Sequence, residues 1–286
     1  KYEYLQMSAL FVINPIAGKG RKEKLLEVLR RGGHRAVLTE YAGQAELIAR
    51  DAVEDVVVAV GGDGTVNEVA RGLLGSDKIL GILPCGSGDG LARCLGIGHK
   101  LSEAIRIIEN GKTAPLDAGF VNGRAFFSVC GVGFDANVSK MFALSGKRGL
   151  STYIAKSVEL WRTFKPERFT INIDGMEWTQ EAVAVIVGNS NQWGNGAKIT
   201  PGADCGDGLL DITVLDMFHS IEIPHLVTLL MSGHSNLSRR SHCYRGRQIR
   251  ISRSSEGPAH FDGDWFDGVK QLDVSLQPSA LRVLVP

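Results

Sequence analysis

The sequence predicts an α/β domain followed by a β-sandwich domain, and three observations support this division. Strand-like apolar runs alternate with helical periodicity up to about residue 115, and short strands separated by Gly, Asn and Asp recur after it. The length of 286 residues accommodates two domains of ordinary size. We predict a first domain over residues 1–115 and a second over residues 116–286, with a ligand site in the cleft between them. As an alternative, the last strand returns to the first domain.

Repeated strand–helix units are expected in the first domain. The run Val56–Val60 is apolar and mostly β-branched, stops at Gly61-Gly62 and is followed by helical periodicity. The other predicted strands are Leu10–Ile13, Arg35–Thr39 and Ile79–Leu83. The predicted helices are Lys22–Arg30, Ala45–Ala52, Val66–Leu74 and Leu101–Ile108. This alternation predicts a mainly parallel, Rossmann-like sheet with helices on both faces.

The second domain is expected to be mostly β. The predicted strands are Ala125–Val129, Phe169–Ile173, Ala182–Gly188, Asp211–Leu215, Gln248–Ser252 and Leu272–Leu276. One helix, Gly149–Thr163, interrupts them. A second apolar stretch, Ile221–Met231, is interpreted as core rather than as a membrane-facing surface. Short strands at this spacing favour a sandwich.

Composition limits the class of partner. A formal net charge of +1 argues against nucleic acid as an obligatory partner. Five cysteines, none in C-x-x-C spacing, favour reduced thiols in a cytoplasmic protein without a zinc site. No apolar run is long enough to span a bilayer, so a lipid substrate would be met peripherally at a membrane surface. The sequence leaves a homodimer open.

One basic cluster stands out in this nearly neutral chain. Six arginines lie between Arg239 and Arg253. We favour a solvated face for them, because arginine is rarely buried. Docking against anionic lipid headgroups is the alternative.

The segment Gly61–Thr65, G-G-D-G-T, carries the strongest local signal. It directly follows a predicted buried strand and directly precedes a predicted helix. Glycines expose backbone N–H groups, and a helix N-terminus favours negative charge, so the loop suits phosphate oxygens. Asp63 would then serve as a ligand of Mg²⁺ rather than face phosphate alone. The alternative is a tight strand–helix turn with Thr65 as the helix N-cap.

Two more glycine-bearing loops follow predicted strands. Asn14-Pro15 with Gly18-Lys19-Gly20 comes after the first strand, and Pro84–Gly88 comes after the strand at Ile79–Leu83. Open α/β sheets bind ligands at the carboxyl ends of their strands. Neither the Walker A pattern nor the dinucleotide fingerprint is present. The loops therefore indicate phosphate binding by another scheme.

The run V-V-V-A-V-G-G-D-G-T-V-N-E-V, Val56–Val69, resembles the nucleotide motif of the diacylglycerol kinase catalytic family, which includes sphingosine and ceramide kinases. The family's other motifs occur in order: N-P-x-x-G, P-x-G-[S/T]-G, G-x-G-F-D at Gly131–Asp135, P-G-A-D-x-x-D-G-x-L-D at Pro201–Asp211, and a late D-G-[E/D] at Asp262–Asp264. The resemblance covers essentially the whole chain.

This resemblance implies an ATP-dependent lipid kinase that uses Mg²⁺. It implies that Asp63 helps to hold the catalytic Mg²⁺ on the phosphates, and that Asp262 or Asp264 is the general base that takes the proton of the lipid hydroxyl. The residues implied to line the ATP site are Asn14, Gly18, Thr39, Gly61, Gly62, Gly64, Thr65, Asn67, Glu68, Gly86 and Ser87. Phosphoryl transfer needs these parts: positioned phosphates, a metal and a carboxylate near the attacking oxygen.

The late motif departs from the family pattern. Asp264 stands where Glu is usual, which leaves open which of the two aspartates is the base. By turn chemistry alone, Asp262-Gly263 is a hairpin turn. A second departure, Ser87–Arg93 as S-G-D-G-L-A-R, is closer to sphingosine kinases than to many bacterial diacylglycerol kinases, so a sphingoid base is a candidate acceptor.

The loop Asp204–Leu209 resembles a structural Mg²⁺ site of bacterial family members. By this resemblance, Asp204, Asp207 and the carbonyl of Leu209 would hold the cation, for which oxygen ligands are suitable. The alternative is an ordinary Asp-Gly turn.

Two other functions compete with lipid phosphorylation. NAD kinases resemble this chain in the G-G-D-G loop and the two-domain build, although Asn67-Glu68 and the late D-G-D fit lipid kinases better. A nucleotide- or lipid-binding regulator without turnover is the second alternative, and its best support is the Asp at position 264.

Overall fold

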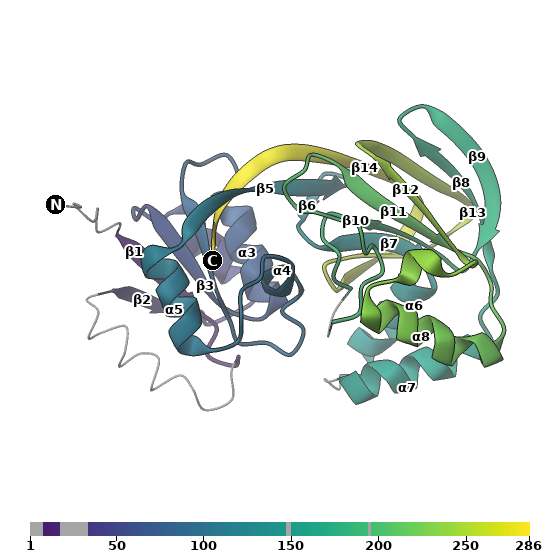
Figure 1. Ribbon diagram of the computed structural model, residues 1–286, viewed down its shortest axis with the longest axis horizontal. Coiled ribbons are helices and arrows are strands. Elements are labelled where there is room, and N and C mark those ends of the chain that lie inside the picture. Colours follow the sequence, from purple (N-terminus) through teal and green to yellow (C-terminus); the bar gives the residue numbers. More distant parts are fainter. Residues whose placement is uncertain (1–7, 18–33, 147–149, 194–195) are drawn as a thin grey trace. The chain divides into compact units, whose positions relative to one another are not determined.

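The computed structural model describes residues 8–17, 34–146, 150–193 and 196–286 (Figure 1). It divides into unit 1, Lys1–Leu116 with Ser279–Pro286, and unit 2, Asp117–Pro278. The chain crosses between the units within β5 (Lys112–Val121) and again within β14 (Asp264–Val285). The helix predicted at Lys22–Arg30 lies outside the described residues.

Unit 1 contains the predicted parallel sheet. Its strands lie in the order β2–β1–β3–β4, and Arg282 and Val283 of β14 add a parallel neighbour to β4. The strands are β1 (Ala9–Ile13), β2 (Arg35–Leu38), β3 (Val56–Gly61) and β4 (Ile79–Pro84). The helices are α2 (Gln44–Arg50), α3 (Asp63–Leu73), α4 (Gly90–Cys94) and α5 (Leu101–Asn110).

Burial explains the composition of these elements. β3 and β4 are buried along their whole length, which is why both read as continuous apolar runs. Helices α2 and α3 approach so closely that a side chain at Gly72 would lie 2.3 Å from the Glu46 carbonyl oxygen. The tight packing of α3 fixes the position of its N-terminus at the end of β3.

Unit 2 consists of two layers of strands. The two layers have two long strands in common, β13 (Gln248–Phe261) and β14. One layer continues from the second half of β13 through β7 (Val129–Gly133), β10 (Ala184–Gly188), β11 (Leu210–Leu215) and β12 (Ser241–Gly246). The other continues from the first half of β13 through β8 (Glu167–Ile173) and β9 (Met176–Ala182), and from β14 through β5 to β6 (Arg124–Phe126). Register shifts between Ser252 and Ala259 separate the two halves of β13.

The core of unit 2 lies between these layers. Phe169 and Ile171 of β8 pack in one cluster with Val185 and Val187 of β10. The alternate residues Ala184 and Ile186 belong to a second cluster on the opposite face. Both faces of β10 are therefore covered, which accounts for the unbroken apolar run in its sequence.

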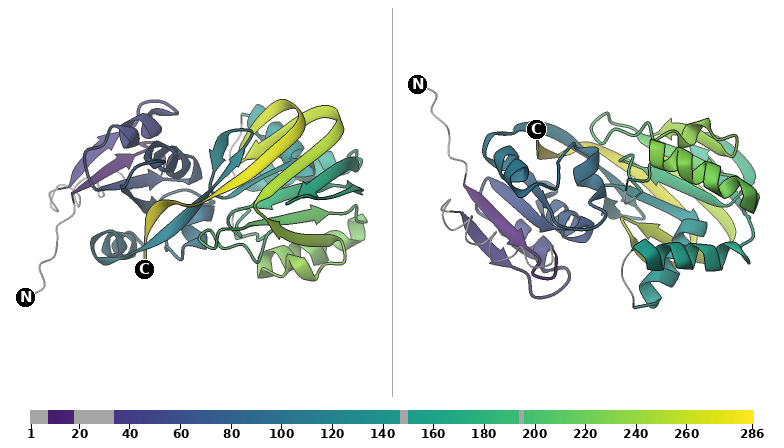
Figure 2. Two further views of the ribbon diagram at one scale, coloured as in Figure 1. Left: turned by 90° about the horizontal axis from the view of Figure 1, so that it is seen from above. Right: turned by 60° about the horizontal axis from the view of Figure 1, so that its bottom comes forward.

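Helices cover that opposite face (Figures 1 and 2). They are α6 (Phe134–Leu144), α7 (Leu150–Trp161) and α8 (Ile223–Ser232), with short 3₁₀ turns η1 (Ser220–Glu222) and η2 (Ser235–Leu237) on either side of α8. Within the described residues, no helix is long and apolar enough to span a membrane.

The interpretation of Ile221–Met231 as core is correct for only part of the stretch. Leu226 and Leu230 are buried, but Ile221, Val227 and Met231 are exposed. The cause is helical geometry: residues four apart share one face of α8, and only one face can meet the sheet.

Several element boundaries differ from the predictions. Helix α3 begins at Asp63 with Gly62 as N-cap, so the interpretation of Thr65 as the N-cap is wrong. The predicted strand Ala125–Val129 is interrupted between β6 and β7 because the backbone N–H groups of Phe127 and Ser128 donate to the Asp262 side chain. Helix α6 and strands β5, β9 and β12 were not expected.

Candidate active site

In unit 1, Asn14–Ala17 of the first loop, the G-G-D-G-T segment and the Pro84–Gly88 loop follow β1, β3 and β4, and Gly18–Gly20 lie outside the described residues. The Asn14 side-chain N–H donates to Thr65 Oγ1 at 3.2 Å. The Cys85 N–H donates to the Gly61 carbonyl at 2.8 Å, and the Gly90 N–H donates to Asp63 Oδ1 at 2.6 Å. Each loop is thus bonded to the G-G-D-G-T segment, which is the central member.

Close backbone contact requires glycine at two of these positions. A side chain at Gly86 would lie 2.7 Å from the Gly62 Cα and 2.6 Å from Asp89 Oδ1. One at Gly61 would lie 2.4 Å from Thr65 Oγ1. For Gly64, in contrast, no atom of the described residues beyond its own helix lies within 4 Å of where its side chain would be. The loops are packed on one side and open at Gly64, where a ligand can approach the first N–H groups of α3.

Two carboxylates lie in this packed region. Asp63 Oδ1 accepts the hydrogen bond from Gly90, and no hydrogen bond to Oδ2 occurs among the described residues. Asp89 is buried, and its Oδ1 accepts from the Gly86 N–H at 3.1 Å. Burial and the nearby charge of Asp63 raise the pKa of Asp89 to about 6. His99 Nδ1 lies 3.3 Å from Asp89 Oδ2, close enough for an ion pair when the imidazole is protonated.

The remaining implied nucleotide residues are distributed unevenly around these loops. Thr39 continues β2, and its N–H donates to the Ile13 carbonyl at 2.9 Å. The Glu68 carboxylate accepts hydrogen bonds from the Gly43 and Ala45 N–H groups, so it binds the N-terminus of α2. Asn67 is buried and Ser87 is exposed, whereas Gly18 lies outside the described residues.

In unit 2 the late acidic motif forms the β13–β14 hairpin. Phe261 pairs with Asp264, and the two residues between them have positive φ, 48° at Asp262 and 88° at Gly263. Positive φ at both central positions identifies the two-residue turn whose twist matches the strands. The turn chemistry visible in the sequence is therefore present in the structure.

The two aspartates of this turn differ in their contacts. The Asp262 carboxylate accepts three backbone hydrogen bonds, from Phe127 at 2.8 Å, Ser128 at 2.8 Å and Val129 at 3.1 Å. It therefore fixes the β6–β7 connection to the hairpin. Asp264 begins β14 and is exposed. Of the two, Asp264 has the more accessible carboxylate.

An apolar cavity of about 380 Å³ lies in unit 2 between α7, α8 and the sheet. Aromatic and aliphatic side chains dominate its lining. They include Phe134, Trp161, Trp193, Phe218, Leu226 and Leu230. Among the described residues that line it, Asp135 is the one acidic residue. A cavity of this size and polarity suits an apolar ligand.

Asp135 is paired with a buried histidine. Its Oδ2 lies 2.6 Å from His260 Nε2, and its Oδ1 accepts from the Ala136 N–H at 2.9 Å. His260 Nδ1 makes no hydrogen bond to any described residue. Burial, followed by the charge of Asp135, raises the pKa of Tyr153, which also lines the cavity. Sequence reasoning assigned no role to Asp135 or His260, because only the fold joins β13 to the start of α6.

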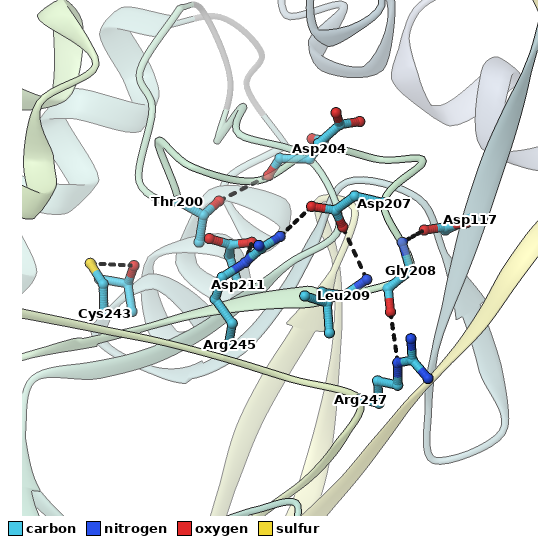
Figure 3. Close-up of polar contacts among 12 residues, drawn as sticks. Asp117, Thr200, Asp204, Asp207, Gly208, Leu209, Asp211, Cys243, Arg245 and Arg247 are labelled. Carbon is cyan, nitrogen blue, oxygen red and sulfur yellow. Dashed lines mark hydrogen bonds and ion pairs between the residues drawn. The ribbon is translucent and has the colours of Figure 1, made fainter.

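The proposed structural cation loop is held by protein contacts (Figure 3). Asp204 Oδ1 accepts from the Gly206 N–H at 3.1 Å, and Asp207 Oδ1 accepts from the Leu209 N–H at 3.0 Å. The other oxygen of Asp207 pairs with the Arg245 guanidinium. Among the described residues, no three acidic, histidine or cysteine side chains are placed to hold a metal ion. The Mg²⁺ site at Asp204, Asp207 and Leu209 stays a prediction.

Most of the arginine cluster makes internal contacts. Arg240 pairs with Glu222, and Arg250 pairs with Asp273. Arg253 is buried, where its guanidinium donates to the Val269 and Pro258 carbonyls, so the solvated-face interpretation is wrong for this residue. Docking against lipid headgroups has little support from a cluster whose charges are paired in this way.

Two protein-family models match the chain in sequence order. The model described as the diacylglycerol kinase catalytic domain matches residues 8–121. The model described as the YegS C-terminal NAD kinase β-sandwich-like domain matches residues 128–285.

Named relatives match over nearly the whole length. A Bacillus subtilis protein named diacylglycerol kinase is 27% identical over 271 residues, covering 90% of this chain and 89% of its own. A Klebsiella pneumoniae protein named "Probable lipid kinase YegS-like" is 30% identical over 296 residues, covering 98% and 96%. A crystal structure described as a diacylglycerol kinase from Bacillus anthracis superposes with a TM-score of 0.76 at 21% identity, covering 100% and 98%. At 21% identity, the similarity to this crystal structure shows a shared fold and nothing more.

Proposed function

Because the chain belongs to the family of diacylglycerol kinases and YegS-like lipid kinases, we propose that it transfers the γ-phosphoryl group of ATP to a hydroxyl group of a lipid. Diacylglycerol and sphingoid bases are the candidate acceptors. The observation that supports the proposal most strongly is the apolar cavity of unit 2. Unit 1 of the same chain has a glycine loop at a helix N-terminus, which suits phosphate. A kinase for small polar acceptors would have no use for such a cavity.

In the proposal, the loops of unit 1 bind the nucleotide. The N–H groups at the start of α3 face the phosphates, and the open space at Gly64 admits them. The proposed nucleotide-binding residues remain Asn14, Gly18, Thr39, Gly61, Gly62, Gly64, Thr65, Asn67, Glu68, Gly86 and Ser87. Asp63 fits Mg²⁺, because its Oδ2 can bind the ion while phosphate oxygens supply further ligands. The ion, when bound, neutralises charge on the transferring phosphoryl group.

Asp264 is the proposed general base. A base needs an accessible carboxylate within hydrogen-bond reach of the hydroxyl. Asp264 is exposed, whereas both oxygens of Asp262 accept backbone hydrogen bonds. Protonating Asp262 would weaken all three of these bonds. We therefore assign Asp262 a positioning role, in which it fixes the turn that presents Asp264.

The lipid tail is proposed to occupy the apolar cavity. Its walls come from α7, α8 and the sheet of unit 2, and Trp161 stacks on Phe218 with ring centroids 4.2 Å apart. The cavity carries little information about headgroups, since apolar walls discriminate weakly between related lipids. Asp135, a buried carboxylate of the lining, is one polar group that a headgroup could meet.

A lipid panel tests the proposal. The purified protein is incubated with γ-labelled ATP, Mg²⁺ and separate detergent micelles of diacylglycerol, monoacylglycerol, sphingosine or ceramide, with NAD as a further acceptor. We expect label in one lipid class. Label only in NAD would favour an NAD kinase-like enzyme, and label in no acceptor, with ATP still bound, would favour a regulator without turnover.

A further inference from the structure

Helix α8 has an unusual surface for a helix on the outside of a protein. Its sequence, I-P-H-L-V-T-L-L-M-S, contains no Asp, Glu, Lys or Arg. Leu226 and Leu230 point into unit 2, but Val227 and Met231 on the outer side are 49% and 55% exposed. Helix α5 of unit 1 shows the ordinary pattern, with Glu103, Arg106 and Glu109 along it. The outer side of α8 also exposes His225, Thr228 and Ser232, but it carries no Asp, Glu, Lys or Arg.

The exposed apolar residues continue beyond α8. Ile221, in η1 before the helix, is 88% exposed, and Leu237, in η2 after it, is 67% exposed. Ile154 and Val158 of α7, one helical turn apart, are each about half exposed. These residues all lie on the elements that form or flank the helical wall of the cavity. We call Ile154, Val158, Ile221, Val227, Met231 and Leu237 the apolar face.

The apolar face is continuous with the cavity. Val158 and Val227 line the cavity and are also about half exposed to solvent. A side chain can do both only where the cavity wall reaches the surface. Arg162, which is exposed and also lines the cavity, adds a positive charge at this place.

We propose that the apolar face docks onto a lipid bilayer and that the acceptor lipid passes from the bilayer into the cavity between α7 and α8. This proposal rests on the lipid kinase function proposed above. It assigns the membrane contact to these helices, instead of to the arginine cluster. Side chains such as Ile221 and Met231 would enter the apolar part of the bilayer, and Arg162 would meet lipid phosphate groups. A lipid leaving the bilayer here would not cross water.

A bilayer fits this face better than a second copy of the chain. A second copy covering the apolar face would also cover Val158 and Val227, and with them the place where the cavity reaches the surface. Isolated exposed apolar residues elsewhere, such as Val53 and Met176, need no partner and provide matched controls. They lie outside the cavity lining, as do Ile221 and Met231.

Vesicle sedimentation tests the proposal. The wild-type chain, the Ile221→Asp/Met231→Asp variant and the control Val53→Asp/Met176→Asp are mixed with vesicles of phosphatidylcholine and phosphatidylglycerol. We expect the wild type and the control to bind alike and the first variant to partition at least tenfold less. A second pair, Ile154→Asp/Leu237→Asp, should behave like the first. Because all these residues are exposed, thermal unfolding should change little.

The outcomes separate this proposal from the proposed function. Both apolar-face variants should still phosphorylate a lipid presented in detergent micelles. Vesicle binding that is equal in all four proteins would overturn the docking proposal and leave the kinase proposal intact. A wild-type dimer in light scattering that the apolar-face variants dissociate would also overturn it, because the face would then be a self-association surface. Absence of micelle activity in the wild type would count against the kinase proposal alone.

Discussion

The two aspartate-bearing glycine turns of this protein use their carboxylates differently. In unit 1, Asp63 accepts one backbone hydrogen bond, from Gly90, and its second oxygen has no such partner among the described residues. In unit 2, Asp262 accepts three backbone hydrogen bonds with its two oxygens. A carboxylate saturated by backbone amides holds structure, whereas one with an open oxygen can bind a metal or a proton. This contrast supports our proposal that Asp63 and Asp264 take part in phosphoryl transfer and that Asp262 positions the turn.

The largest effect is expected from Asp264→Asn. Removing the proposed general base should lower phosphoryl transfer by about 10²- to 10⁴-fold without changing the fold, since the residue is exposed. Single-turnover transfer from γ-labelled ATP measures the rate. Asp267→Asn, an exposed aspartate three residues further along, is the control and should stay within a fewfold of wild type. Equal rates for wild type and Asp264→Asn would refute the assignment of the base.

Asp262→Ala should instead act on stability. Three N–H groups lose their acceptor, and alanine must adopt a φ of 48°, so we expect the free energy of unfolding to fall by about 3 kcal/mol. Chemical denaturation measures this. Asp262→Asn retains one carbonyl oxygen and tolerates positive φ, so it should lose less. Should the Asp262→Ala protein unfold like the wild type yet lose all transfer, the roles of the two aspartates would be reversed.

Glycine substitutions test whether the loops of unit 1 form a packed phosphate site. Gly86→Ala places a methyl group 2.7 Å from the Gly62 Cα, so we expect it to lower both the melting temperature and the affinity for ATP, the latter by tenfold or more. Gly64→Ala has room for its methyl group and should lower ATP affinity with little change in melting temperature. Calorimetry of ATP binding, together with the melting temperature, distinguishes the two variants. ATP affinity unchanged in both variants would place the nucleotide elsewhere.

The smallest effect concerns pH. Burial and the charge of Asp63 raise the pKa of Asp89 from 3.8 to about 6. Between about pH 4 and pH 6 the folded chain keeps a proton that the unfolded chain releases, so stability falls as pH rises through this window. Relative to Asp89→Asn, the wild type should lose on the order of 1 kcal/mol of stability over this window. Denaturation of both proteins at pH 4.5 and pH 7 checks the sign, and a relative gain by the wild type would contradict it.

Much of the fold was predictable because its signals are local. Val56–Val60 reads as a buried strand since both faces of β3 are covered, and the Gly61-Gly62 stop coincides with the real boundary. The family resemblance extended this to fold class, which the matches to both domains confirm. The predicted helix Val66–Leu74 starts three residues too late, because α3 begins at Asp63 and its N-cap, Gly62, has no side chain that could mark the start.

The contacts that could not be predicted from the sequence join residues that are far apart in the chain. The Asp135–His260 pair joins residues 125 positions apart, and the three backbone N–H groups that donate to Asp262 are more than 130 positions away from it. Burial of Arg253 depends on carbonyls exposed by the irregular register of β13. The interpretation of Ile221–Met231 as core is wrong for its exposed residues, because periodicity shows which residues share a helix face but not whether another element covers that face.

We propose that unit 1 positions ATP and that Asp264 of unit 2 activates a lipid hydroxyl. The most direct measurement compares label transfer from γ-labelled ATP to the best acceptor lipid in micelles for the wild type, Asp63→Ala, Asp264→Asn and Asp262→Asn, each shown to be folded. We expect label transfer with the wild type, loss by orders of magnitude with Asp63→Ala and Asp264→Asn, and a smaller loss with Asp262→Asn. Lipid labelling that survives both Asp63→Ala and Asp264→Asn would contradict the proposal.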